Sequence, residues 1–179
     1  MAMALSSLTS LFSTIRSPAS RLAGWPVLLL LGLAALGLSI PVYRHSGVLM
    51  DLGAPLGILS LQLTCSAHSA GEMLAAWGIA GMHHARLSLL WDCPYAIAYG
   101  LALSGLAWRL AHRAVLAWLP LLAAGLDLLE NACHLMLLSA PAGPWALPAC
   151  LFALAKWGLL GCWFLALVWL LLVGHRRSV

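Results

Sequence analysis

Four long runs of hydrophobic residues divide the chain, at 25–43, 87–110, 114–139 and 145–174. Each run is near or above the roughly 20 residues that a membrane-spanning helix needs. Inside a bilayer every backbone polar group must be bonded within its own segment, so these runs are expected to be helices and not strands. The pattern therefore predicts an all-α fold, a four-helix transmembrane bundle.

The longest connection, residues 44–86, lies between the first two runs and is expected to form a small extracytoplasmic cap. Residues 59–65 alternate apolar and polar side chains with period two, which is typical of a strand. Ser69 and Glu72 have the spacing of a capping box. A short amphipathic helix is expected to follow them and to end at Gly78.

The first 24 residues contain two arginines, no acidic residue and several serines and threonines. An organelle transit peptide has such a composition. The large apolar residues of 1–24 fall at helical spacing, however, which favours a cytoplasmic segment lying in the membrane interface. Residues 175–179 are expected to be a short cytoplasmic tail.

Composition agrees with a membrane location, because 63% of the residues are hydrophobic and 8% are charged. A soluble domain carries roughly 25% charged residues. The lipid bilayer is therefore the expected partner. The net charge of +4 comes from basic residues scattered in pairs, which does not form the clustered basic face of a nucleic-acid-binding protein. The chain has no Rossmann, Walker or nucleophile-elbow motif, so nucleotide binding is not expected either.

The distribution of arginines predicts the orientation of the bundle. Two lie in the connection between the first two runs, Arg44 and Arg86. Six lie on the other side of the bundle: Arg16, Arg21, Arg109, Arg113, Arg176 and Arg177. By the positive-inside rule, both termini are expected in the cytoplasm.

None of the five cysteines is spaced C-x-x-C. This argues against a thioredoxin-like enzyme and against a structural zinc site. Cys133, Cys150 and Cys162 are instead expected to be small apolar fillers at helix contacts.

Ionisable residues inside the hydrophobic runs are the main candidates for function. Asp127, Glu130, Asn131 and His134 lie in the run 114–139. At 100° per residue they share an arc of about 100° on one helix face. A charge in hydrocarbon costs at least a few kcal/mol, so such residues normally face the interior of a bundle and mark a functional path.

The neighbouring runs carry polar residues at matching depths. Asp92, Tyr95 and Tyr99 share a face of the second run, and Lys156 shares a face with Trp163 on the fourth. If these faces meet, acids, bases and phenols form a ladder from the membrane midplane to the outer surface.

Several hypotheses fit this ladder. In the first, Lys156 neutralises Asp127, Asn131 bonds a backbone carbonyl, and the network only specifies how the helices pack. Three acids, a histidine and a lysine exceed what packing needs, because buried ion pairs stabilise a protein poorly compared with apolar contacts.

In the second hypothesis the cluster binds a small lipophilic molecule, transforms it, or relays protons. Asp127 or Glu130 would be the general base, Lys156 would tune it, and Tyr95 or Tyr99 would orient the substrate. The further candidate ligand contacts are Asp92, Tyr99, Asn131, His134 and Trp163. No cofactor is identified by the pattern.

A metal site is a variant of this hypothesis, because Asp127, Glu130 and His134 place three ligand types on one face. The signal is weak. Known bundle sites draw matched ligands from several helices, only Asp92 could clearly add one here, and Lys156 would oppose a cation. No metal ligand is therefore predicted.

In the third hypothesis the protein is a non-catalytic accessory or assembly subunit of a larger membrane complex. The cap segment 57–78 would then dock on a membrane-protein partner through Leu59, Leu61 or Trp77.

Asp92 has a simpler alternative role. It precedes Cys93 and Pro94, so it could be the N-cap of a helix that starts at Cys93. Otherwise Pro94 would kink the helix beside the site, because proline removes a backbone hydrogen bond.

Four short motifs of this chain resemble a pattern in uncharacterised four-span bacterial membrane proteins: Asp92-Cys93-Pro94-Tyr95, Asp127-Leu128-Leu129-Glu130-Asn131, Leu61-Gln62-Leu63 and Trp77. The resemblance covers residues 57–131. The family pattern has an acid where this chain has Gln62, so no role is carried over to that position. The resemblance implies the four-span architecture and a bacterial inner membrane, and it implies no activity.

Overall fold

The computed structural model describes residues 23–111, 113–141 and 143–176, and within these ranges the protein is helical without strands. The first 22 residues and the last three lie outside the described part, so the expected interfacial segment and most of the expected tail remain predictions. The helices are α3 (Trp25–Asp51), α4 (Ile58–Gln62), α5 (Ala67–Ala111), α6 (Ala114–Ser139) and α7 (Ala146–Arg176).

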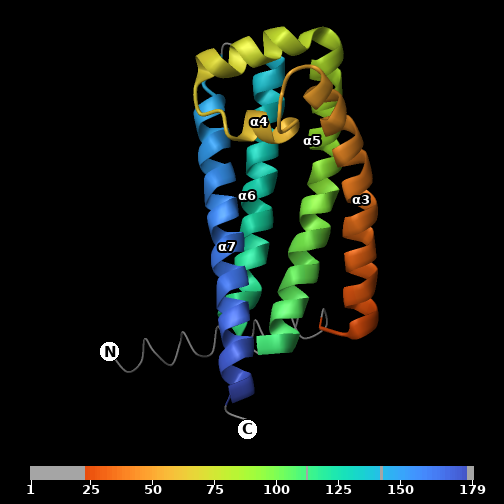
Figure 1. Ribbon diagram of the computed structural model, residues 1–179, viewed down its shortest axis with the longest axis vertical. Coiled ribbons are helices and arrows are strands. Elements are labelled where there is room, and N and C mark those ends of the chain that lie inside the picture. Colours follow the sequence, from red (N-terminus) through yellow and green to blue (C-terminus); the bar gives the residue numbers. More distant parts are fainter. Residues whose placement is uncertain (1–22, 112, 142, 177–179) are drawn as a thin grey trace, which may run out of the picture.

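Four long helical segments run side by side along the long axis of the molecule: α3, the second part of α5, α6 and α7 (Figure 1). α5 packs against α3 on one side and α6 on the other, and α6 packs against α7. α3 is thus the outermost helix of the array. Its outward side chains remain exposed, and they are Leu29, Leu30, Leu33, Leu36 and Ile40.

Three of the described helices are long and apolar enough to cross a membrane. They are α3, α6 and the part of α7 from Ala146 to Leu170. Leucines exposed on α3 suit hydrocarbon, where an apolar side chain needs no protein partner. These three helices are those expected of an integral membrane protein.

The long helix α5 bends at Gly78, where the backbone adopts φ 60° and ψ −167°. A left-handed φ of this kind is costly for residues with a Cβ, which explains a glycine at the bend. The segment before Gly78 lies across one end of the molecule, and the segment after it descends beside α6 (Figure 1). The predicted end of a short helix at Gly78 is therefore confirmed.

The start of that helix differs from the prediction. α5 begins at Ala67, and the hydroxyl of Ser66 accepts a hydrogen bond from the backbone N–H of Ser69 at 3.4 Å. Ser66 therefore caps the helix, and the capping box predicted from Ser69 is wrong. Glu72 instead lies 3.4 Å from His68, one turn earlier on the exposed face.

The strand predicted for 59–65 is also wrong, because this segment contains the short helix α4. Its backbone groups bond locally, with the N–H of Leu63 donating to the carbonyl of Leu59 at 3.1 Å. A lone strand would have left these groups without a partner. Gly57, with φ 59°, introduces the helix, and the Ser46 hydroxyl of α3 accepts a hydrogen bond from the N–H of Ile58 at 3.0 Å.

An apolar core joins the short helices to the ends of the long ones. Leu61 and Trp77 lie inside it, 1% and 3% exposed. They pack with Leu49 of α3, Leu89 of α5 and Leu137 of α6. Neither Leu61 nor Trp77 is available to a docking partner, whereas Leu59 remains 38% exposed.

A disulfide joins Cys65, between α4 and α5, to Cys150 in the first turns of α7. The expectation that Cys150 is an apolar filler is therefore wrong. The C-x-x-C spacing rule could not reveal the pair, because its members are 85 residues apart and meet only when the chain has folded. The disulfide fixes the short helices onto the end of the bundle.

Candidate functional site

Lys156 of α7 lies between two carboxylates of α6. Its ammonium nitrogen is 2.7 Å from Asp127 Oδ1 and 2.6 Å from Glu130 Oε2. Asp127 and Glu130 are one helical turn apart, so one lysine can reach both. The contact with Asp127 is a hydrogen-bonded ion pair. The contact with Glu130 is an ion pair as well.

Tyr99 of α5 completes the surroundings of Asp127. Its hydroxyl donates a hydrogen bond to Asp127 Oδ2 at 2.9 Å. The ring of Tyr95, one turn earlier, lies against that of Tyr99 with centroids 5.3 Å apart. Asp127 is therefore held from two helices at once, by a cation from α7 and by a phenol from α5.

Asp92 joins the cluster through Asn131. The Asn131 amide donates a hydrogen bond to Asp92 Oδ2 at 2.8 Å and lies 3.9 Å from the sulfur of Cys93. Asp92 lies well inside α5, which also includes Pro94. The alternative role of Asp92 as an N-cap is therefore wrong, because the helix begins well before it.

His134 lies one turn beyond Glu130, with Nδ1 3.9 Å from Glu130 Oε1. The side chain is 1% exposed, and neither ring nitrogen has a hydrogen-bond partner among the described residues. Other buried polar atoms of the cluster that lack such a partner are Glu130 Oε1 and Asn131 Oδ1. Unsatisfied groups of this kind are costly in a protein interior and are normally met by water or a ligand.

The cluster has one closed side and one more open side. The α6 and α7 residues are almost fully buried: Asp127, Glu130, Asn131, His134 and Lys156. The α5 residues Asp92, Tyr95 and Tyr99 are only partly buried. A molecule reaching the cluster laterally would therefore meet the α5 side first.

The charges of the cluster do not balance. Asp92, Asp127 and Glu130 bring three carboxylates, and Lys156 brings the ammonium group that pairs with two of them. Uncompensated buried charge is expensive, so the surplus must be met by protons or by a cationic group. The site is thus suited to taking up and releasing positive charge.

Trp163, a predicted ligand contact, lies outside the cluster. Trp163 lies two turns further along α7, in a separate apolar group with Ala107, Leu116 and Leu167. Gln62, to which the resemblance carries over no role, is 5% exposed at the end of α4. Its side-chain oxygen has no hydrogen-bond partner among the described residues. No local sequence signal indicated this burial, because Gln62 is polar and ends a helix that also includes Ser60.

The described residues contain no group of three or more His, Cys, Asp or Glu side chains that could hold a metal ion. Asp127, Glu130 and His134 share a face of α6, but Lys156 occupies the space between the first two. The ammonium group of Lys156 is therefore the cation at the position between these two carboxylates.

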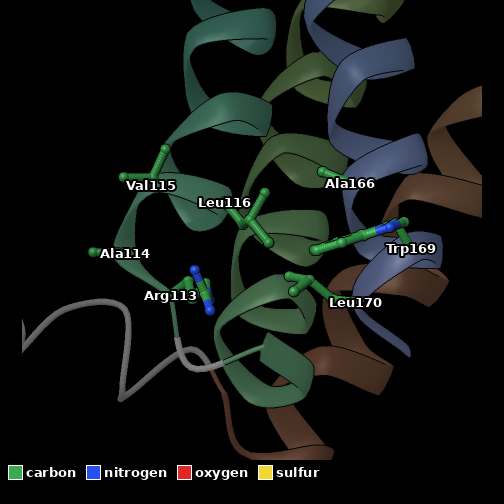
Figure 2. Close-up of a pocket in the computed structure, with 7 residues that line it drawn as sticks. All are labelled: Arg113, Ala114, Val115, Leu116, Ala166, Trp169 and Leu170. Atoms are coloured by element: carbon green, nitrogen blue, oxygen red, sulfur yellow. The ribbon is translucent and has the colours of Figure 1, made fainter. Parts of the chain in front are cut away.

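A surface groove of about 680 Å³ lies far from the cluster, between the start of α6 and the end of α7 (Figure 2). Leu116 in its wall is roughly 16 Å along α6 from Asp127, at 1.5 Å per residue. Its lining is apolar apart from Arg113 and the indole of Trp169. The groove lacks acids and bases other than Arg113, so the acid–base cluster remains the candidate site.

No protein-family model matches this chain, no curated protein aligns with it, and no solved structure matches its fold.

Proposed function

We propose that the protein is a four-span membrane protein that binds a small lipophilic molecule at the cluster of Asp127, Glu130 and Lys156 and exchanges protons with it. The observation that carries this proposal is that Lys156 bridges two buried carboxylates next to Tyr99, which is only partly buried.

The second part of α5 is the fourth span in this proposal. Residues 79–111 would extend roughly 50 Å as a helix, more than a bilayer core requires. The segment is less apolar than the others because it contributes Asp92, Tyr95 and Tyr99 to the cluster. A polar residue within a span is tolerated where it faces the bundle interior.

The proposal places the protein in a bacterial inner membrane, with both termini in the cytoplasm and the short helices on the outer face. Two independent features support this orientation. In the sequence, six of the eight arginines belong to the segments that the positive-inside rule assigns to the cytoplasm. The disulfide between Cys65 and Cys150 lies at the opposite end. Disulfides persist in oxidising compartments such as the periplasm and are rare in the cytosol.

The geometry assigns a role to each group. Lys156 contacts Asp127 and Glu130 and holds both carboxyl groups in place. Glu130 Oε1 and His134 remain free to accept or pass a proton. Proton transfer to a reacting group requires a donor or acceptor within hydrogen-bond reach, which a ligand entering past Tyr99 would find.

The competing hypothesis is that the cluster only fixes helix packing. Buried ion pairs are often no more stabilising than apolar residues of the same volume. Packing also gives no reason for the unpartnered atoms of Glu130, Asn131 and His134. These atoms are better explained by a ligand or by ordered water that passes protons.

Native mass spectrometry of the protein, gently extracted from its own membrane, tests the proposal. We expect a bound small molecule that is lost in Glu130→Gln. Glu72→Gln is the matched control, because Glu72 is exposed on the short segment before Gly78. Retained thermal unfolding behaviour in Glu130→Gln would show that the fold survives the change.

A bare protein, or one bound only to other polypeptides, would contradict the proposal. The second of these results would favour the accessory-subunit hypothesis. A ligand retained in Glu130→Gln would move the binding site away from the cluster.

A further inference from the structure

We infer, on the premise of the proposed function, that the ligand is a lipophilic cation, an amine or onium ion with apolar substituents, held by Asp92 and the Tyr95–Tyr99 pair in exchange for a proton.

Of the three carboxylates in the cluster, Asp92 is the one with which Lys156 forms no ion pair. Lys156 contacts Asp127 and Glu130, and among the described residues no basic side chain forms an ion pair with Asp92. Its one described hydrogen bond comes from the neutral amide of Asn131 at 2.8 Å. An amide can orient a carboxylate but cannot neutralise it, so Asp92 is where a further positive charge is needed.

Asp92 also lies on the accessible side of the cluster. It is partly buried, as are Tyr95 and Tyr99, whereas Asp127 and Glu130 are 3% and 0% exposed. Positions 92, 95 and 99 share one face of α5, because they are three and four residues apart. A ligand approaching from the bilayer therefore meets one acid and two aromatic rings together.

The two rings suit a cation with apolar substituents. Their centroids are 5.3 Å apart and the planes are inclined by 57°. Tyr99 is fixed by its hydrogen bond to Asp127, which leaves the ring itself available. Aromatic faces attract ammonium groups most strongly where water is excluded, and aromatic cages are the usual receptors of quaternary ammonium ions.

Lys156 does not prevent such binding. Its ammonium group lies on the closed side of the cluster, within 2.7 Å of two carboxylate oxygens, and is 3% exposed. The two carboxylates together outweigh its single charge. The groups around a cation at Asp92 would thus carry a net negative charge even with Lys156 ionised.

Proton exchange follows from charge balance. In the ligand-free site at low pH, the carboxyl group of Asp92 carries a proton. When the cation binds, that proton leaves and the carboxylate pairs with the ligand, so the total charge of the site is unchanged. Proton and cation then compete, and affinity for the cation rises with pH.

Isothermal titration calorimetry of the full chain in detergent tests this inference. The probe is tetraphenylphosphonium, a permanent lipophilic cation, and the neutral comparison is triphenylphosphine oxide. Titrations in two buffers of different ionisation enthalpy count the protons released. We expect the cation to bind with release of up to one proton, fewer as the pH rises, and its Kd to fall by up to about tenfold per pH unit while that proton is displaced.

Asp92→Asn is expected to weaken binding of the cation at least tenfold and to remove its pH dependence. Glu72→Gln, which removes an exposed acid, is expected to leave both unchanged. Tyr95→Leu provides a second variant that does not alter charge, and it is expected to weaken the cation several-fold with the proton release intact.

The outcomes separate the two proposals. If the neutral probe binds as well as the cation, or if Asp92→Asn binds the cation as the native protein does, the cation inference is wrong and the proposed lipophilic site remains. If neither probe binds, and the natural membrane extract also yields no ligand, both proposals are wrong.

Discussion

Asn131 of α6 donates a hydrogen bond to Asp92 of α5 across 2.8 Å, which joins two helices through residues 39 positions apart. The donor is fully buried, and its carbonyl oxygen lacks a described partner. The contact holds the carboxylate of the partly buried Asp92 against α6.

Asn131→Leu is expected to destabilise the protein, because it leaves Asp92 without its donor. Hydrogen bonds to charged groups contribute roughly 1.5–3 kcal/mol. Thermal unfolding in mild detergent measures the loss. The double variant Asp92→Leu/Asn131→Leu should recover much of it, since replacing both partners by apolar groups is close to neutral. If the double variant is as unstable as the sum of the single changes, the two residues are not coupled.

Lys156→Met is expected to be more damaging, because two buried carboxylates then face each other without a cation. Breaking a buried pair from one side costs about 3–5 kcal/mol. Adding Asp127→Asn and Glu130→Gln should restore stability, as no charge is left uncompensated. The free energy of unfolding of the single and triple variants checks this. Equal stability of Lys156→Met and the native protein would mean that the ion pairs do not form.

Gly100→Ala is expected to force α5 and α6 apart. A Cβ at Gly100 would lie 2.6 Å from the Cβ of Ala124, which is closer than side chains approach. Overpacking of this kind costs about 1–3 kcal/mol. Gly125→Ala is the control, because a Cβ there meets no atom within 4 Å. Melting temperatures of the two variants should differ, and equal temperatures would contradict the close approach of α5 and α6.

Cys65→Ser and Cys150→Ser are expected to destabilise the protein to the same extent, because each removes the same cross-link. Loss of a native disulfide typically costs about 2–5 kcal/mol. The double variant should be no less stable than either single one. Cys162→Ser, at an exposed free cysteine, should have no effect. Thiol labelling of the unsubstituted protein under denaturing conditions, before and after reduction, should show two cysteines that react only after reduction. If all five cysteines react before reduction, the bond is excluded.

Much of the cluster could be predicted from spacing. Asp127, Glu130 and Asn131 fall on one face of any regular helix, and Lys156 matches their depth when adjacent helices run in opposite directions. These are local consequences of helical geometry. The short connection between α6 and α7 makes these two helices neighbours, so little beyond the sequence was needed to place the lysine near the acids.

The short helices were predicted less well, because local patterns there are ambiguous. Five to seven residues that alternate in polarity also fit one turn and a half of helix, and residues 59–65 belong to that case. Ser66 and Ser69 both precede a helical pattern, and only the hydrogen bond from the Ser69 N–H identifies Ser66 as the cap. The disulfide depends on a tertiary contact that no local pattern contains.

The position of the disulfide has a consequence for biosynthesis. Cys65 emerges from the ribosome early, whereas Cys150 belongs to the beginning of the last long helix. The bond therefore cannot form until α5 and α6 have been synthesised and the start of α7 has reached Cys65. Its formation marks the moment when the start of α7 has met the segment between α4 and α5, and the thiol state of Cys65 during synthesis would report when that contact is made.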